Sequence, residues 1–422
     1  MAQPQLAGGS DPADVRRLVF LFGLAYFAQG LGQHGGLISQ PLNYYLKEGA
    51  GLSPAETAEY ISVLVLPWII KPLYGLVSDY VPLFGYRRKA WLLLVNLAAA
   101  SGFLWLTGLT EPGTVIAALV LTAFGTAASD VIIDALMVEN GDRTGQTARF
   151  QGIQWTWFRL AMITTGLAGG FLASRFEPAT ALHIAATVTM LAPISILLAS
   201  YFIVRETPSP LTREQARETT RSIIDAVRSP EIRIGAAFLV LWCFSPAFST
   251  PLYYHMVDRL HFDQGFIGQL TALTHVGGML GAYLFARVLS RKSTYFRANL
   301  SIVAAVSGIL AYLSLAQPSA YAAGIAMPLN VYVGFVNQIG TLTVFALAAS
   351  VCPPRAAGFA FALLMSIYNG AEQLSAILGA RLYGDVFAKN FEPLLWVAAG
   401  SLLCCFALVP MLRRLDPAPA HA

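Results

Sequence analysis

The sequence predicts an all-α, polytopic membrane protein with about twelve transmembrane helices in two six-helix bundles. Hydrophobic residues make up 56% of the 422-residue chain and charged residues only 12%, which is about half the charged share of an ordinary soluble domain. The apolar runs are ~20 residues or longer, enough to cross ~30 Å of hydrocarbon. A soluble protein of this length would need far more charge on its surface, so a soluble fold is excluded.

Each predicted span is an apolar run between two turns. The runs cover 18–45, 55–79, 90–110, 113–138, 148–174, 179–204, 232–256, 264–289, 296–316, 319–350, 357–386 and 392–412. The first run is too long for the apolar core of a cleavable signal peptide, so we expect it to act as an uncleaved anchor.

The basic residues fall mainly on one side of the predicted membrane. When alternate loops are assigned to opposite faces, twenty of the 27 Lys and Arg lie on one face. The opposite face receives only Lys47, Arg175, Arg259 and Lys389. The positive-inside rule then places both termini in the cytoplasm, which requires an even number of spans in a cell (inner) membrane. The net charge of +4 belongs to this asymmetry, and no basic stripe indicates a nucleic-acid partner.

The chain divides at residues 205–230, its longest polar stretch, which has six predicted spans on either side. We therefore predict an N-terminal bundle at 1–204, a cytoplasmic linker at 205–230 and a C-terminal bundle at 231–422. Thr212 and Gln215 have the spacing of a capping box, which favours an amphipathic helix in the linker. An unstructured linker is the alternative.

A lysine interrupts the second apolar run. Lys71 lies between Pro67 and Pro72, and each proline forfeits a helix hydrogen bond, so we expect a bend here. A charge at this depth is costly and usually faces a cavity or a partner. The run ends near Asp79 and is followed by a basic turn, Arg87-Arg88-Lys89.

Two aspartates lie one helical turn apart in the fourth run. Asp130 and Asp134 are spaced i, i+4, so both side chains lie on one face of the helix. Two carboxylates in a medium of low dielectric repel each other when both are charged, which favours one of them holding a proton near neutral pH. The pair is therefore a candidate for carrying or relaying protons. The alternative is a structural ion pair with Lys71 or Arg159.

Arg159 lies near the middle of the fifth run, with Trp155 one turn before it. A guanidinium at this depth needs a carboxylate, from the protein or from a substrate, and can bind one through two hydrogen bonds. Arg159 and Lys71 together balance the two aspartates in charge. We therefore expect the four side chains to form one network whose pairing a substrate or a proton can switch.

Polar side chains mark other spans as well. In the first run, Gln29 and Gln33 lie on one side of the helix, where they face either a wet interior or a neighbouring helix. In the eleventh run, Glu372 is a second candidate for proton binding, with Asn369 one turn before it. His275 in the eighth run is a third, because histidine titrates near physiological pH.

The chain lacks the patterns of an enzyme. It has no paired Cys and His spacing for a metal, no phosphate-binding glycine loop and no Ser–His–Asp pattern on a soluble domain. We therefore expect no cofactor and no ATP-driven pump within this chain. A membrane-embedded enzyme or an assembly factor is the alternative to a carrier.

Several segments resemble a known family. The turn after the second span is similar to the loop motif of the major facilitator superfamily, with four residues inserted; its matching residues are Gly75, Asp79, Gly85, Arg87 and Arg88. Residues 70–88, 128–139, 352–354 and 361–369 resemble the folate–biopterin transporter family within that superfamily. The muropeptide permease family shares the Asp-x-x-x-Asp-Ala pattern of the fourth span and is the nearest rival.

The resemblance implies a secondary transporter that rocks its two halves to expose a central site to each side in turn. The implied substrate is a pteridine, a folate or a similar organic anion, moved with protons across the lipid bilayer by a monomer; a carrier of a different amphiphile is the alternative. From the buried polar residues we predict substrate binding by Arg159, Lys71, Gln29, Gln33, Trp155 and Asn369 and proton coupling by Asp130, Asp134 and Glu372. The resemblance implies that Asp79, Arg87 and Arg88 latch a cytoplasmic gate.

Overall fold

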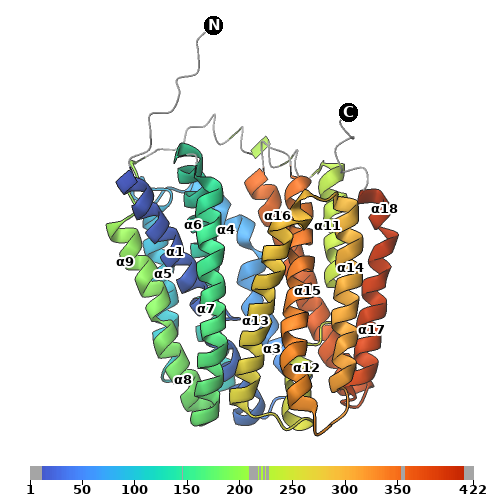
Figure 1. The fold of residues 1–422 in the computed structure, drawn as a ribbon. Coiled ribbons are helices and arrows are strands. Elements are labelled where there is room, and N and C mark those ends of the chain that lie inside the picture. The colour runs from blue at the N-terminus through green and yellow to red at the C-terminus, as the bar shows by residue number, and fades with distance from the viewer. Residues whose placement is uncertain are drawn as a thin grey trace.

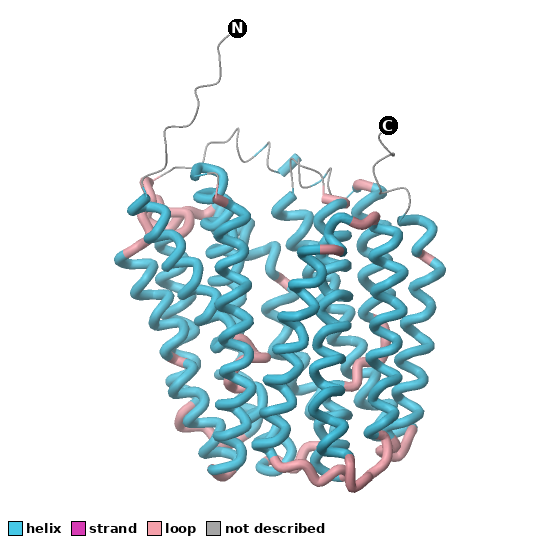
Figure 2. Tube along the Cα trace, viewed as in Figure 1, coloured by secondary structure: helices cyan, strands magenta, loops and turns pink. Residues whose placement is uncertain are grey.

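The computed structural model describes residues 12–144, 146–208, 228–352 and 357–412, together with Arg217, Thr220, Arg221 and Ile224. Long helices run side by side across the molecule (Figure 1), and loops join them at its two ends (Figure 2). Within these ranges the structure has no β-strand, only an isolated bridge between Leu83 and Tyr86. α1 begins and α18 ends at the same end of the bundle. We call this end the terminal end and the opposite end the distal end.

The N-terminal half is made of the helices from α1 to α9. These are α1 (Pro12–Gly32), α2 (Ser39–Tyr44), η1 (Tyr45–Gly49), α3 (Pro54–Ile69), α4 (Lys71–Tyr80), α5 (Lys89–Leu106), α6 (Pro112–Thr144), α7 (Thr147–Arg175), α8 (Pro178–Thr189) and α9 (Leu191–Phe202).

The C-terminal half is made of the helices from α11 to α18. These are α11 (Pro230–Cys243), α12 (Ser249–Asp258), α13 (Gln264–Arg287), η2 (Leu289–Arg291), α14 (Thr294–Ala311), η3 (Tyr312–Leu315), α15 (Ala322–Ser350), α16 (Ala357–Arg381), η5 (Leu382–Val386), α17 (Phe391–Leu403), η6 (Cys404–Ala407) and α18 (Val409–Leu412).

Every predicted span falls on one helix or on consecutive helices, which confirms the all-α, polytopic fold. Seven segments of the described chain are helical, long and apolar enough to cross a membrane. They are Pro54–Tyr80, Lys89–Leu106, Pro112–Gly141, Pro178–Phe202, Gln264–Arg291, Thr294–Leu315 and Ala322–Ser350.

Some spans are broken rather than continuous. The second is divided at Ile70, between α3 and α4, so the predicted bend at the prolines is confirmed. The first is divided between Gly32 and Ser39, and the seventh between α11 and α12. The apolar runs at 18–45 and 232–256 are thus each built from more than one helix. Glycines at 35 and 36 and Pro246 occupy these breaks, where they favour turns over helix.

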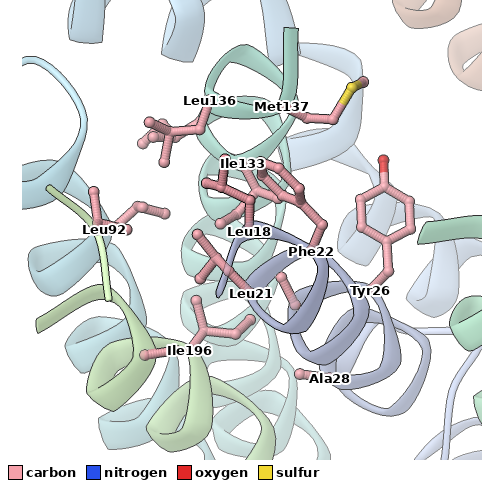
Figure 3. Close-up of a cluster of buried hydrophobic side chains, with 14 of the residues drawn as sticks. Leu18, Leu21, Phe22, Tyr26, Ala28, Leu92, Ile133, Leu136, Met137 and Ile196 are labelled. Atoms are coloured by element: carbon pink, nitrogen blue, oxygen red, sulfur yellow. The ribbon is translucent and has the colours of Figure 1, made fainter. Parts of the chain in front are cut away.

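Each half has one apolar core near the terminal end and another near the distal end. In the N-terminal half, Leu21, Phe22 and Phe150 belong to the terminal core, of which Figure 3 shows part. Leu46 and Phe103 belong to the distal core of the same half. These cores hold each half together. The polar side chains described below make contacts that join one helix to another.

The two halves meet along α7 with α13 and along α3 with α16. At the first contact a Cβ built on Gly170 would lie 2.7 Å from the Cα of Gly268, and one on Gly166 would lie 3.0 Å from the amide nitrogen of Ala272. The two backbones therefore touch without intervening side chains. The predicted capping box of Thr212 and Gln215 lies outside the described residues.

Candidate functional site

Lys71 and Asp130 form a buried ion pair inside the N-terminal half. Lys71 is the first residue of α4, because Pro72 favours the first turn of a helix. Its Nζ lies 2.5 Å from Oδ2 of Asp130 on α6 and 4.6 Å from the centre of the Trp68 ring. The side chains of Lys71 and Asp130 expose 19% and 4% of their surface. The alternative of an ion pair between Asp130 and Lys71 is therefore observed.

Asp134 has a different partner, although it lies one turn from Asp130. The hydroxyl of Tyr26 on α1 donates a hydrogen bond of 2.5 Å to Oδ1 of Asp134. Tyr26 itself is buried. The two carboxylates lie close enough for their charges to interact. A cation holds Asp130, whereas a neutral hydroxyl holds Asp134.

Arg159 lies between the two halves. Its Nη2 donates a hydrogen bond to Oε1 of Gln338 on α15, and its Nη1 lies 3.8 Å from the position of a Cβ built on Gly278 of α13. Its guanidinium carbon lies 5.8 Å from the centre of the Trp155 ring. Among the described residues, the ion pairs include no carboxylate partner for Arg159.

The expectation of one network of four charges is therefore wrong. Lys71 and Asp130 pair within the N-terminal half, whereas Arg159 reaches across to the C-terminal half. The physical reason is the side of each helix on which the charge lies. Arg159 lies on the side of α7 that faces α13 and α15, whereas Lys71 of α4 and Asp130 of α6 face each other. Gln338 was not predicted as a site residue. The sequence marks it only as an amide within the apolar run at 319–350, and the structure shows that it is buried.

Gln29 and Gln33 have different surroundings. Gln29 lines a small cavity inside the N-terminal half, together with Asn96, Ser129 and Asp130. Gln33, which lies just after the end of α1, donates from Nε2 to the sulfur of Met162 at 3.4 Å. Gln29 is thus close to the ion pair, and Gln33 is close to the helix that carries Arg159.

Asn369 and Glu372 lie on α16, at the other contact between the halves. Nδ2 of Asn369 donates to the backbone oxygen of Trp68 at 3.3 Å, which joins α16 to α3. Glu372 is exposed and has no hydrogen-bond or ion-pair partner among the described residues; its charge acts on Tyr368 and Cys243. His275 lies within the electrostatic range of Arg159. The described part of the chain holds no cluster of side chains suited to a metal ion.

The predicted gate residues surround Arg88 at the terminal end. Nη2 of Arg88 lies 2.7 Å from Oδ1 of Asp79 and 2.8 Å from Oε1 of Glu139, and its Nη1 donates to the hydroxyl of Ser78 at 2.7 Å. Helices α4, α5 and α6 are therefore tied together by one guanidinium. Arg87 takes part through its backbone amide rather than through a side-chain contact found in the structure.

Glu206, which the sequence reasoning missed, holds the turn before α5. Its carboxylate accepts hydrogen bonds from three consecutive backbone amides, those of Arg87 at 2.7 Å, Arg88 at 3.1 Å and Lys89 at 2.8 Å. An acidic group at a helix N-terminus satisfies free amides and interacts favourably with the helix dipole. The segment after α9 is thereby fastened to the same turn that carries Arg88.

Comparisons with known proteins point to one family. The model of the BT1 family matches residues 29–420. A folate-biopterin transporter from Synechocystis sp. is 32% identical over 85% of this chain and 73% of its own length. The probable folate-biopterin transporter 4 of Arabidopsis thaliana is 23% identical over 93% of this chain and 94% of its own length. Folate transporter 1 of Plasmodium falciparum is 22% identical over 90% of this chain and 75% of its own length.

Solved structures show the fold. The nucleoside transporter NupG has a TM-score of 0.70 at 14% identity, over 95% of this chain and 99% of that one. A D-xylose-proton symporter has a TM-score of 0.71 at 13% identity, over 94% and 97% of the two chains. The resemblance to the folate–biopterin transporter family of the major facilitator superfamily is thus confirmed. The chain belongs to the BT1 family, and it is a multi-pass membrane transporter of the major facilitator fold and not an enzyme.

Proposed function

We propose that this transporter carries a small organic anion by alternating access and that proton movement drives it. The observation that carries the proposal is Arg159, whose guanidinium lies between the halves with an amide as its hydrogen-bond partner. A buried charge without a counter-ion is costly, and a substrate carboxylate would supply one. Because Arg159 and Gln338 belong to different halves, an anion bound here would contact both, as transport by rocking requires.

The substrate class is a pteridine or a folate. The relatives from Synechocystis and Plasmodium carry the names of folate or folate-biopterin transporters. A folate has carboxylates for Arg159 and a flat ring for Trp155, whose surface is 44% exposed. Asn369, Gln29, Gln33 and Lys71 are the other candidate substrate contacts, and Lys71 becomes available when its bond to Asp130 breaks.

Protons act on the carboxylates of α6. A proton on Asp130 removes the charge that holds Lys71 in place, and a proton exchanged with Asp134 changes its bond to Tyr26. Glu372 is a second proton site, because it is unpaired in the described chain. Asp79 and Arg88, with the backbone of Arg87, latch the gate at the terminal end.

The terminal end faces the cytoplasm in the cell (inner) membrane, because most of the basic residues lie in the loops assigned to that side. The bundles at 1–204 and 231–422 move relative to each other about the linker at 205–230. A monomer suffices for this motion.

The proposal is tested by uptake of labelled folate and biopterin into proteoliposomes, with and without an inward proton gradient. Arg159→Gln should abolish the uptake of folate, whose carboxylates it is proposed to bind, while thermal unfolding stays near that of the wild type. Arg175→Gln, on the last turn of the same helix, is the matched control and should keep uptake. Uptake that survives Arg159→Gln in a folded protein removes Arg159 from the mechanism.

A further inference from the structure

A cluster of polar contacts joins the two halves at the distal end. Lys47 of η1 lies 2.7 Å from Oδ1 of Asp258 at the end of α12. Tyr254 of α12 reaches the loop before α3, where its hydroxyl donates to the backbone oxygen of Leu52 at 2.5 Å. The hydroxyl oxygen of Tyr254 also lies 2.9 Å from Oγ1 of Thr57, within hydrogen-bond distance.

The Tyr254 contact is sealed from water. Tyr254 exposes 3% of its surface and Thr57 none. The Nζ of Lys47 lies 5.4 Å from the centre of the Tyr254 ring. The Lys47 side chain is 11% exposed, whereas that of its partner Asp258 is 38% exposed. Hydrogen bonds and charges that are shielded in this way are stronger than those in water.

A second ion pair between the halves is much more open. Arg381 at the end of α16 contacts Glu59 of α3, and the two side chains expose 60% and 45% of their surface. Exposed pairs contribute little, because water and salt compete for both charges. The Tyr254 contact is therefore the best shielded part of the cluster, and the Lys47–Asp258 pair is intermediate between it and the open pair.

We propose that Tyr254 and the Lys47–Asp258 pair form a lock that keeps the distal end closed. Tyr254 acts by donating a hydrogen bond to Leu52 in the loop between η1 and α3, and Lys47 acts by binding a carboxylate of the opposite half. This inference rests on the proposed alternating access, because only then must the distal end open. The lock then sets how the protein divides its time between the distally closed and distally open states.

The chain offers a matched control for each part of the lock. Tyr253, the neighbour of Tyr254, is also buried, but its hydroxyl donates to Gln264 of its own half at 3.3 Å. Glu48 lies 2.6 Å from the same Lys47 that contacts Asp258, but it belongs to the same half as the lysine. Tyr253→Phe and Glu48→Gln thus remove similar groups and cut only contacts within one half. Gln264 keeps its bond to Gln40 of the opposite half, whose Nε2 donates to its backbone oxygen at 2.6 Å.

The experiment measures the distance between spin labels on the two halves at the distal end. The labels are placed by Thr110→Cys and Ala320→Cys, on a background in which the four native cysteines are replaced. Tyr254→Phe should raise the ratio of long to short distances about five- to tenfold, the effect of one hydrogen bond. Asp258→Asn should raise it about two- to fivefold, because water screens its partly exposed carboxylate. Tyr253→Phe, Glu48→Gln and Glu59→Gln should leave the ratio near the wild-type value.

Two outcomes would overturn the lock. The first is a distance distribution for Tyr254→Phe that matches Tyr253→Phe; the second is an equal response of Asp258→Asn and Glu48→Gln. Thermal unfolding of each variant shows that these comparisons are made on folded protein. Failure of the proposed function looks different: the wild type would then take up no folate or biopterin, while the label distances would still report the lock.

Discussion

Lys71 and Asp130 join α4 to α6 through an ion pair of 2.5 Å that is largely shielded from water. Each charge is tolerated at this depth because the other is present. Neutralising one partner of a buried pair leaves the other without a counter-ion, which costs roughly 3–5 kcal/mol. A single proton on Asp130 would therefore change the balance of forces between two helices.

Asp130→Asn should lower the melting temperature of the purified protein, because Lys71 then carries an uncompensated charge. The double variant Lys71→Gln with Asp130→Asn should recover most of the loss, since it removes both charges together. Thermal unfolding in detergent measures both effects. A single variant as stable as the wild type would mean that the pair contributes nothing to stability.

Asp134→Asn should flatten the dependence of uptake on pH, because an amide cannot take up a proton in this range. Tyr26→Phe keeps the carboxylate but removes its hydrogen-bond donor, so uptake should stay pH-dependent with a displaced midpoint. Initial uptake rates measured between about pH 5 and 8, around physiological pH, decide the matter. Identical profiles for Asp134→Asn and the wild type would exclude Asp134 from proton coupling.

Arg159→Lys should weaken substrate binding by tenfold or more, roughly the value of a charged hydrogen bond. Lysine keeps the charge but loses the planar fork that binds a carboxylate through two hydrogen bonds. Binding is followed by the thermal shift of the purified protein over a folate titration. An unchanged affinity would indicate that the substrate does not engage the guanidinium in this way.

Glu206→Ala should free the turn before α5, because three backbone amides lose their acceptor. Loss of a helix cap costs roughly 0.5–2 kcal/mol, so trypsin should cut at Arg87, Arg88 or Lys89 several times faster. Glu231→Ala is the control, since Glu231 lies in the first turn of α11 and is exposed. Equal cleavage rates for the two variants would show that Glu206 does not hold the turn.

The positions of the helices could be predicted because a span must be long and apolar, and both properties are visible in the sequence. The bend near Lys71 could be predicted because proline removes a backbone donor. The pairing of Lys71 with Asp130 was one of the alternatives, since charges at similar depth on neighbouring helices need each other.

The partner of Arg159 could not be predicted in the same way. The sequence gives the depth of a residue in the membrane, but not the direction in which its helix is turned, so α15 could not be identified as the neighbour. Glu206 was missed for another reason. Its partners are backbone amides, which every residue but proline carries, and such a contact leaves no signature in the residue types around it.

In the proposed rocking motion, the bare contact between α7 and α13 would act as the pivot. Gly170 lies about 8 Å from the distal end of α7 and about 35 Å from its terminal end, at 1.5 Å per residue. With no side chains to disengage, the two backbones can roll on each other at this point. A small rolling angle would then move the terminal ends of the halves several times further than the distal ends. The larger movement would therefore occur on the side that carries Arg88.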